Sequence, residues 1–226
     1  MRPRIICHML SSVDGKTDGA ALGAVSGESD YEATGALLGG DAWACGRATM
    51  EEGFAAGTFS PASSTPAGPQ PPYVARRAES YAVSVDTLGK LRWAGGDLDG
   101  EHLICVVSEQ APADYLTTLR EDGVSYIVAG GSSVDLGAAV DALGEHFGVR
   151  TLLLEGGGHI NGAFLKAGLV DELSLLIAPG IDGRGDVAAV FDGVSAEAHR
   201  AVPLELKSVE QRDGGVLWLR YDVVRP

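Results

Sequence analysis

Short apolar runs alternate with amphipathic segments along most of the chain. The runs are rich in branched side chains and have the length of buried strands. The segments between them space their apolar residues every three or four positions, as helices do. Pro112 opens one such helix and Gly123 ends it. The pattern predicts strands at 4–10, 42–46, 80–86, 102–108, 125–130, 150–156 and 171–179, and helices at 28–40, from 47 onward, 112–123, 135–148 and 159–168.

Three segments depart from this alternation. Residues 11–29 are rich in Gly, Ser and Asp and are predicted to form a loop. Residues 57–72, GTFSPASSTPAGPQPP, are predicted to form an exposed, mobile insertion near the edge of a site, because their prolines forbid regular structure. Residues 204–213 and 216–224 are joined through two glycines and predict an antiparallel hairpin.

Together these elements predict one α/β domain over 1–226. Alternating strands and helices favour a mainly parallel sheet between two helix layers, an α/β/α arrangement, and the hairpin would add an antiparallel edge. The insertion at 57–72 is not taken as a domain boundary, because the same alternation resumes after it and neither side is long enough to stand alone comfortably.

The charge balance limits the partners. Thirty-one acids against 17 bases give a net charge of −14, which repels nucleic-acid backbones and anionic membranes. A phosphorylated ligand would therefore need local main-chain N–H groups and a few arginines. No apolar run approaches the roughly 20 residues of a membrane span, so we expect a cytoplasmic protein.

The cysteines and histidines show no metal-ligand spacing, so we predict no metal. Cys7, Cys45 and Cys105 lie in apolar runs and are predicted to be buried free thiols. His8 lies on a buried strand pattern and is predicted to be a core residue. The other histidines away from the glycine stretch are predicted to lie on the surface: His102, His146 and His199.

Three strand-to-helix junctions suit an anion. In LLLEGGG, Gly157 and Gly158 have no side chains and precede a helix, so a pyrophosphate would reach their N–H groups; the alternative is a tight turn that needs positive φ. A second junction carries Gly46, Arg47 and Thr49, although Arg47 is equally a solvated surface charge. The third junction carries Gly130, Gly131, Ser132 and Ser133. Three junctions of this kind favour a long, multiply charged ligand such as a dinucleotide.

The ordered motifs resemble one known family. SSVDGK, SGES, CGRAT, VSVDT, LLLEGGG and LVDELSLLIAP follow one another as in the reductase domain of the bifunctional riboflavin-biosynthesis deaminase-reductase, which has the dihydrofolate-reductase-like fold. The resemblance covers nearly the whole chain and is weakest at 55–78 and 186–203. It implies an NADPH-dependent oxidoreductase that reduces 5-amino-6-(5-phosphoribosylamino)uracil or a related ribosylaminopyrimidinone 5′-phosphate, and it implies a homodimer.

The resemblance also implies site residues. Ser12 and Asp14 would lie near the substrate and the nicotinamide ring, with Ser29 beside the substrate. Asp14 is a candidate for a proton-relaying role, and an ordinary turn residue is the alternative. His159 would either approach the pyrophosphate or cap its helix. The positions implied for NADPH are Tyr31, Thr49, Thr87, Glu155, Gly157, Gly158, His159, Ile160 and Asn161, joined by Gly46, Arg47 and Gly130 from the junctions above.

Two departures from the family leave alternatives open. The family carries an arginine after the first helix, where this chain has LLGGDAW, and an acid-acid-proline stretch followed by an arginine, where this chain has TMEEGFAAGTF. A substrate phosphate would lack those cations. One alternative is a dihydrofolate or pterin reductase that binds its substrate through Glu28, Asp30 or Glu32. The others are another small-molecule reductase and a non-catalytic nucleotide-binding module. The alternative cofactor is a reduced deazaflavin in place of NADPH.

Overall fold

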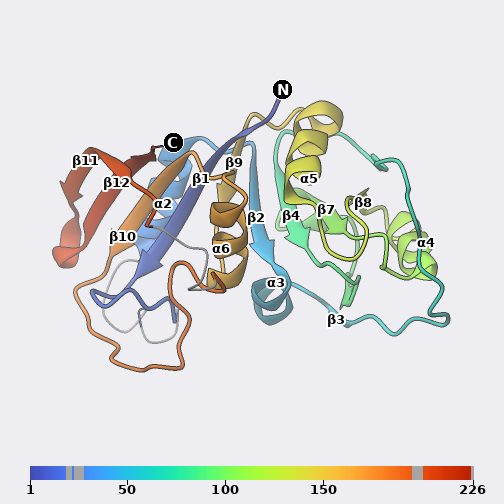
Figure 1. The fold of residues 1–226 in the computed structure, drawn as a ribbon, viewed down its shortest axis with the longest axis horizontal. Coiled ribbons are helices and arrows are strands. Elements are labelled where there is room, and N and C mark those ends of the chain that lie inside the picture. The colour runs from blue at the N-terminus through green and yellow to red at the C-terminus, as the bar shows by residue number, and fades with distance from the viewer. Residues whose placement is uncertain (19–21, 23–27, 195–200, 225–226) are drawn as a thin grey trace. The chain divides into compact units, whose positions relative to one another are not determined.

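The computed structural model describes residues 1–18, 22, 28–194 and 201–224 (Figure 1). The chain forms two compact units, each described here by itself. Unit 1 comprises residues 1–3 and 41–152, and unit 2 comprises residues 4–40 and 153–226. Strand β9 (Thr151–Leu154) carries the chain from the first unit into the second. That the two units act as a single domain stays a prediction.

Unit 1 is built on parallel strands. β4 lies between β2 and β7, and β7 also pairs with β8 in parallel and with the short β6 in antiparallel register. A separate two-stranded ribbon pairs β3 with β5. The elements are β2 (Ala42–Gly46), α3 (Arg47–Gly53), β3 (Gly57–Thr58), β4 (Tyr81–Val85), β5 (Leu91–Arg92), β6 (Asp97–Leu98), β7 (Glu101–Val107), α4 (Ala113–Glu121), β8 (Ser125–Val128), α5 (Leu136–Ala142) and a π-helical turn (Leu143–Phe147).

The core of unit 1 forms where α4 packs against these strands. Tyr115 and Leu119 of α4 and Tyr126 of β8 are almost fully buried, together with Trp93 and Leu103. Burial of large apolar side chains stabilises by about 1.5–3 kcal/mol each, so this cluster is a main source of the unit's stability.

Four strands of unit 2, β1, β10, β11 and β12, are joined by one parallel and two antiparallel pairings. β1 pairs with β10 in parallel, β10 with β12 in antiparallel register, and β12 with β11 as the C-terminal hairpin. Gly214 and Gly215 form the hairpin turn with φ of 68° and 84°, conformations that favour glycine. The elements are β1 (Arg4–Ser11), α2 (Glu28–Leu38), α6 (Gly158–Lys166), β10 (Glu172–Ile177), β11 (Leu204–Gln211) and β12 (Leu217–Val223).

Side-chain alternation along β1 places helices on both faces of that strand. Successive residues of a strand point to opposite faces. The ring of His8 stacks on Tyr31 of α2, with centroids 4.4 Å apart. A Cβ placed on Gly156, in the turn before α6, would lie 3.1 Å from the Sδ of Met9. The α/β class, the mainly parallel strands and the C-terminal hairpin are therefore confirmed, and unit 2 by itself has the predicted layers.

The Pro-rich segment 57–72 is tied down along its length. Asp114 of α4 accepts hydrogen bonds from two main-chain N–H groups of the segment, at 2.6 and 3.2 Å. Ala67 donates its N–H to the carbonyl oxygen of Ala111, just before α4, at 2.8 Å. Tyr73 then exchanges two main-chain hydrogen bonds with Tyr126, at 2.9 and 3.0 Å. The segment is mostly irregular and exposed, as predicted, but its first two residues form β3 and its anchors contradict the prediction of mobility.

His102 corrects a prediction of surface exposure. It is fully buried in β7, and its Nδ1 lies 2.8 Å from the carbonyl oxygen of Gly96. Arg76 donates from Nε to the same Nδ1 at 3.0 Å, and Nε2 lies 2.7 Å from the hydroxyl oxygen of Ser125. Burial lowers the pKa of His102. His146 is half-buried, and His199 lies outside the described residues.

The three thiols are buried, as predicted. Cys7 lies in unit 2, and Cys45 and Cys105 lie in unit 1; none forms a disulfide. Burial raises the pKa of Cys7 and of Cys105, so neither thiol ionises readily. Among the helices of the described residues, none has both the length and the apolar character needed to cross a bilayer.

Candidate functional site

In unit 1, a cavity at the carboxyl end of β4 brings together two of the predicted residues. Gly46 precedes α3 in extended conformation, which places Arg47 in the first turn of the helix, where it forms an ion pair with Glu51. Arg47 and Thr87 both line a cavity of about 150 Å³. The cavity's lining residues are Arg47, Val85, Asp86, Thr87, Leu88 and Lys90.

Asp86 and Lys90 are site residues that the sequence analysis missed. The Oδ2 of Asp86 accepts hydrogen bonds from the N–H groups of Lys90 and Leu91, at 2.5 and 2.8 Å, which fixes the turn that carries Lys90. Burial raises the pKa of Asp86, against the lowering effect of these hydrogen bonds and of the Arg47 charge. Its Oδ1 is buried and has no hydrogen-bond partner among the described residues. An acid directly after a buried strand and four residues before a lysine was the available signal.

Gly130 has a conformational reason to be glycine. Its φ is +84°, and a Cβ there would lie 2.3 Å from the carbonyl oxygen of Ser133. The helix that follows is capped from within the chain, because Asp135 accepts a hydrogen bond from the N–H of Ala138 at 3.0 Å. A carboxylate therefore already lies at the start of α5, where the sequence analysis placed a third anion site. Thr49 lies half-buried on α3, and its contact with a cofactor, like that of Gly130, stays a prediction.

In unit 2, the glycine stretch is packed against the chain itself. Gly157 precedes α6 and Gly158 is its first residue. The carbonyl oxygen of Gly158 accepts a hydrogen bond from the N–H of Asp192 at 2.9 Å. A Cβ on Gly158 would lie 2.3 Å from the carbonyl oxygen of Ala189 and 2.6 Å from the Oδ2 of Asp192. Glycine is therefore needed at position 158 so that segment 189–192 can pack against the helix start. The sequence analysis had suggested a different reason, that the missing side chain lets a pyrophosphate reach the main chain.

The same segment engages Asn161. This side chain is fully buried, and its Nδ2 donates to the carbonyl oxygen of Val190 at 2.8 Å. Its Oδ1 is buried and has no hydrogen-bond partner among the described residues, so only a cofactor contact through Nδ2 would require the bond to Val190 to break. His159 is exposed beside Gly193, and Ile160 and Glu155 are half-buried. Of the predicted stretch, the structure leaves His159 the most open to a ligand.

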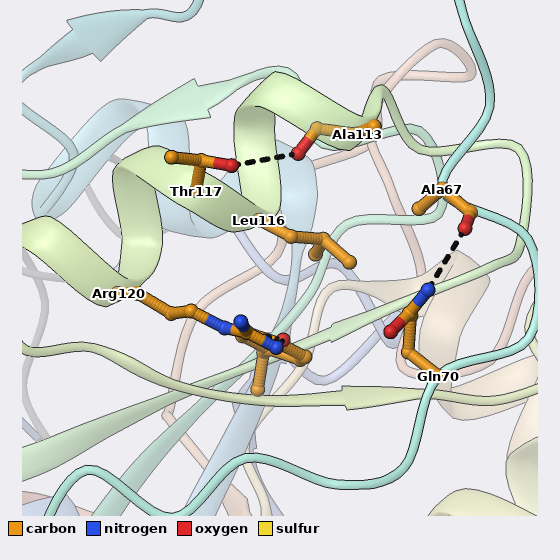
Figure 2. Close-up of a pocket in the computed structure, with 7 residues that line it drawn as sticks. Ala67, Gln70, Ala113, Leu116, Thr117 and Arg120 are labelled. Carbon is orange, nitrogen blue, oxygen red and sulfur yellow. Dashed lines mark hydrogen bonds between the residues drawn. The ribbon is translucent and has the colours of Figure 1, made fainter.

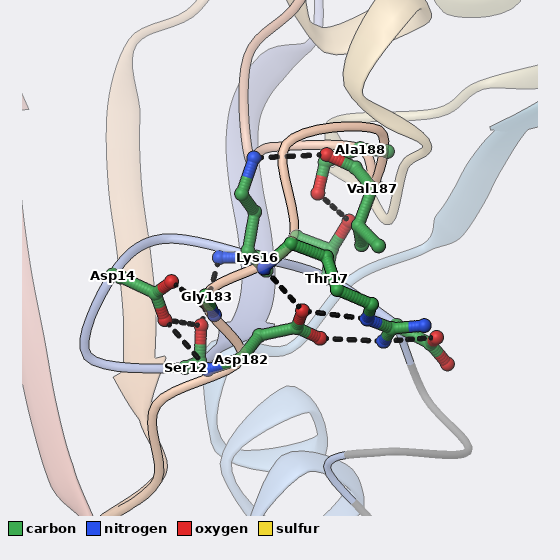
Figure 3. A network of polar contacts seen from close by, with 10 residues as sticks. Ser12, Asp14, Lys16, Thr17, Asp182, Gly183, Val187 and Ala188 are labelled. Carbon is green, nitrogen blue, oxygen red and sulfur yellow. Dashed lines mark hydrogen bonds and ion pairs between the residues drawn. The ribbon is translucent and has the colours of Figure 1, made fainter.

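Ser12 and Asp14 belong to a closed polar network in unit 2 (Figure 3). Asp14 accepts hydrogen bonds from the Ser12 hydroxyl at 2.7 Å and from the N–H groups of Asp182 and Gly183, at 3.0 and 2.8 Å. These donors, the Ser12 hydroxyl first, hold the pKa of Asp14 well below its usual range. Lys16 donates from Nζ to the carbonyl oxygen of Val187 at 3.0 Å. Asp14 is thus an ionised anchor between two loops, an arrangement that does not favour the proton-relaying role.

Tyr31 and Ser29 lie on α2. The hydroxyl of Tyr31 donates to the carbonyl oxygen of His8 at 3.3 Å, and Ser29 is exposed. The Nε2 of His8 lies 3.0 Å from the carbonyl oxygen of Tyr31, so this nitrogen carries the proton. Ser174 then donates to Nδ1 at 3.0 Å while accepting from the indole of Trp218 at 2.8 Å. His8 is fully buried, which confirms the prediction of a core residue.

This network predicts a pH dependence of stability. Burial lowers the pKa of His8, so the folded state resists protonation more than the unfolded state, where the pKa is about 6.5. The contribution of His8 is fully present above that value and is lost as pH falls through the folded-state pKa. We expect the free energy of unfolding in urea to fall between about pH 8 and about pH 5.

Two substitutions separate the sources of that slope. Glutamine does not titrate, so His8→Gln is expected to flatten the slope of the unfolding free energy against pH. His102→Gln should also flatten this slope, by an amount of its own, because burial lowers the pKa of His102 as well. An unchanged slope in His8→Gln would contradict the assignment.

Solved structures share the architecture of the whole chain. A pyrimidine reductase-like protein from Corynebacterium diphtheriae superposes with a TM-score of 0.73 at 21% identity, over 99% of this chain and 93% of that one. Acinetobacter baumannii RibD superposes with a TM-score of 0.71 at 20% identity, over 99% of this chain and 58% of that one. The fold is thus that of the RibD-type reductases. The model of the RibD C-terminal domain family matches residues 3–218, and the chain belongs to that family. The resemblance drawn from the sequence motifs is confirmed.

Curated relatives match part of the chain. The 2,5-diamino-6-ribosylamino-4(3H)-pyrimidinone 5′-phosphate reductase of Methanothermobacter thermautotrophicus is 40% identical over 102 residues, which are 45% of this chain and 46% of that protein. The protein of the same name from Aquifex aeolicus is 33% identical over 90 residues, which are 40% of each chain. The chain therefore spans less than half the length of the curated relatives in these matches.

Proposed function

We propose that the chain is an NADPH-dependent reductase of a ribosylaminopyrimidinone 5′-phosphate. Its curated relatives are named as reductases of such a substrate, and NADPH is the cofactor that the family resemblance implies. The observation that carries the proposal is the unit 1 cavity. Arg47 and Lys90 line it together with Thr87 and one acid, Asp86, in a chain whose net charge is −14. Two cations against one acid at one concave place suit a phosphate group, which the rest of so acidic a surface would repel.

The unit 1 cavity and the start of α6 differ in how well they suit the phosphate groups of NADPH. The unit 1 cavity has the size and charge for a phosphate group rather than for a whole dinucleotide. At α6, the carboxylate of Asp192 and the carbonyl of Ala189 crowd Gly158. We therefore assign any phosphate contact at α6 to Gly157 and His159 rather than to Gly158. Five cofactor contacts are proposed on the resemblance alone, those of Tyr31, Thr49, Glu155, Ile160 and Asn161. Those of Gly46 and Gly130 are proposed from the strand-to-helix junctions.

NADPH supplies the hydride when bound, and the chain supplies binding and orientation. Asp86 holds the turn that presents Lys90, through hydrogen bonds to two main-chain N–H groups. In unit 2, Asp14 ties the loop carrying Ser12 to the loop carrying Asp182 and Gly183. Because Asp14 stays ionised, we assign it and Ser12 to shaping this region, with Ser29 exposed at the start of α2 as the proposed substrate contact.

A comparison of two substrates under NADPH tests the activity. We expect oxidation of NADPH, followed by loss of its near-ultraviolet absorbance, with 2,5-diamino-6-ribosylamino-4(3H)-pyrimidinone 5′-phosphate and none with dihydrofolate. The pterin alternative is disfavoured because Asp30, one of its candidate acids, forms an ion pair with Arg212 at 3.1 Å. Turnover with dihydrofolate alone would overturn the proposal, and tight NADPH binding without any turnover would favour the non-catalytic alternative.

Arg47→Ala tests the cofactor part within the same assay. A charge-assisted hydrogen bond contributes about 1.5–3 kcal/mol, so NADPH affinity should fall by roughly tenfold to a hundredfold while NADH affinity changes less. Arg77→Ala removes an exposed arginine of the same unit that does not line the cavity, and it should leave both affinities unchanged. Equal losses in the two variants would contradict the assignment. Should a reduced deazaflavin support turnover where NADPH does not, the cofactor proposal fails.

A homodimer and a cytoplasmic location are further proposals. The homodimer rests on the family resemblance, and the location rests on the lack of an apolar run in the sequence that is long enough for a membrane span. The β11 edge strand supports the first, because Leu204, Leu206 and Val209 are exposed on it. Exposed apolar side chains along an unpaired edge suit a second copy of the chain.

A further inference from the structure

A second cavity in unit 1 lies between the Pro-rich segment, α4 and β8 (Figure 2). Its volume is about 180 Å³, room for about six water molecules at about 30 Å³ each. Sites for drug-sized ligands begin at about 300 Å³, so a nucleotide does not fit. The lining residues are Ala67, Gln70, Ala113, Leu116, Thr117, Arg120 and Tyr126.

The guanidinium of Arg120 is fixed in this cavity without a counter-charge. Its Nε donates to the hydroxyl of Tyr126 at 2.8 Å, and its Nη2 donates to the same oxygen. It also lies over the rings of Tyr73 and Tyr126, 5.2 and 5.4 Å from their centroids. No carboxylate in the described parts of the chain forms an ion pair with it. In a chain with almost twice as many acids as bases, an exposed arginine that is held without an acid is a candidate binding group for an external anion.

Tyr126 holds the guanidinium in place. Its side chain is fully buried, and its oxygen accepts hydrogen bonds from Nε and Nη2 of Arg120. The remaining N–H groups of the guanidinium, on Nη1 and Nη2, have no acceptor among the described residues. The cavity thus offers the free edge of a fixed guanidinium.

The remaining lining selects among anions. Leu116, Ala67 and Ala113 present hydrocarbon, and the amide of Gln70 is turned to the carbonyl oxygen of Ala67 at 3.1 Å (Figure 2). The two Nη groups of the guanidinium match the two oxygens of a carboxylate, and the hydrocarbon of Leu116, Ala67 and Ala113 suits a short aliphatic chain, which a phosphate ion lacks. We propose that this cavity binds a small aliphatic carboxylate, separately from the proposed cofactor cavity.

Propionate is the probe for this proposal. The Nε–H resonance of Arg120 in a ¹H–¹⁵N correlation spectrum is followed while sodium propionate replaces sodium chloride at constant ionic strength. We expect a saturable shift. The neutral analogue 1-propanol and inorganic phosphate should give no saturable shift. Saturation by 1-propanol or by phosphate in place of propionate would overturn the carboxylate assignment, and so would the lack of saturation with propionate.

Variants connect the shift to the cavity. Arg120→Gln should weaken propionate binding by about tenfold or more, measured on the main-chain N–H of Thr117. Ala67→Leu keeps Arg120 and fills the cavity from the opposite wall, so it should abolish the shift even if Arg120→Gln folds poorly. Arg77→Gln makes the same change of charge outside the cavity and should bind propionate as the original chain does. Undiminished binding in Ala67→Leu would refute the site.

Discussion

Replacing Gly162 by alanine is expected to destabilise the chain by about 3 kcal/mol. A Cβ at this position would lie 1.9 Å from the carbonyl oxygen of Asp192 and 3.0 Å from its carbonyl carbon. Both are main-chain atoms, so no side-chain rotation relieves the clash. Segment 189–192 would have to move, and the hydrogen bonds from Asp192 to Gly158 and from Asn161 to Val190 would be strained or lost.

The direction of the change makes this test decisive. In the interior of a helix, glycine to alanine normally stabilises by roughly 0.5–1 kcal/mol. Chemical denaturation of Gly162→Ala should therefore show a loss where helix propensity alone gives a gain. Gly185→Ala is the matched control in unit 2, because nothing lies within 4 Å of its Cβ position, and it should change stability by less than about 0.5 kcal/mol. A gain in Gly162→Ala would mean that α6 and segment 189–192 do not pack as described.

Replacing Glu172 by glutamine is expected to cost about 2–3 kcal/mol. Glu172 is fully buried on β10 and accepts from Arg220 at 2.6 Å, from Lys207 at 2.7 Å and from Arg4. Removing one member of a buried charge cluster typically costs about 3–5 kcal/mol. The estimate here is lower because the three cations are partly exposed and can regain water.

Denaturation in urea measures this loss as well. The control is Glu210→Gln, an exposed acid on β11 that lies 3.8 Å from Arg212 and should change stability by less than about 0.5 kcal/mol. Added salt should weaken the exposed pair more than the Glu172 cluster, because buried charges are screened less. Equal small effects for the two substitutions would show that the buried cluster contributes little.

Local chemistry made much of the fold predictable. Pro112 and Gly123 bound α4 within one or two residues, and Gly214 and Gly215 form the hairpin turn that their sequence indicates. The two-residue strands β5 and β6 were missed because neither is long enough to show a period. His102 was misplaced because a single polar residue in an apolar run gives no sign of a buried acceptor such as Gly96.

The candidate site was predictable only where a junction or a family motif marks a residue. Arg47 at the start of α3 was predicted from a junction of strand and helix and Thr87 after β4 from the family resemblance, and the structure places both at one cavity. The role of Gly158 could not be found in this way. Its neighbours, Ala189 and Asp192, follow it by more than thirty residues in a stretch without a repeating pattern. Three consecutive glycines indicate close approach, but they do not indicate what approaches.

The distribution of the thiols allows the unfolding rate of each unit to be measured separately. Unit 2 carries Cys7 alone, whereas unit 1 carries Cys45 and Cys105, and all three are shielded from reagent in the closed fold. The alkylation rate of each cysteine can be followed by peptide mass spectrometry in one sample, without an introduced label. Equal rates in the two units would indicate that they unfold together, and different rates would indicate that each unit unfolds separately.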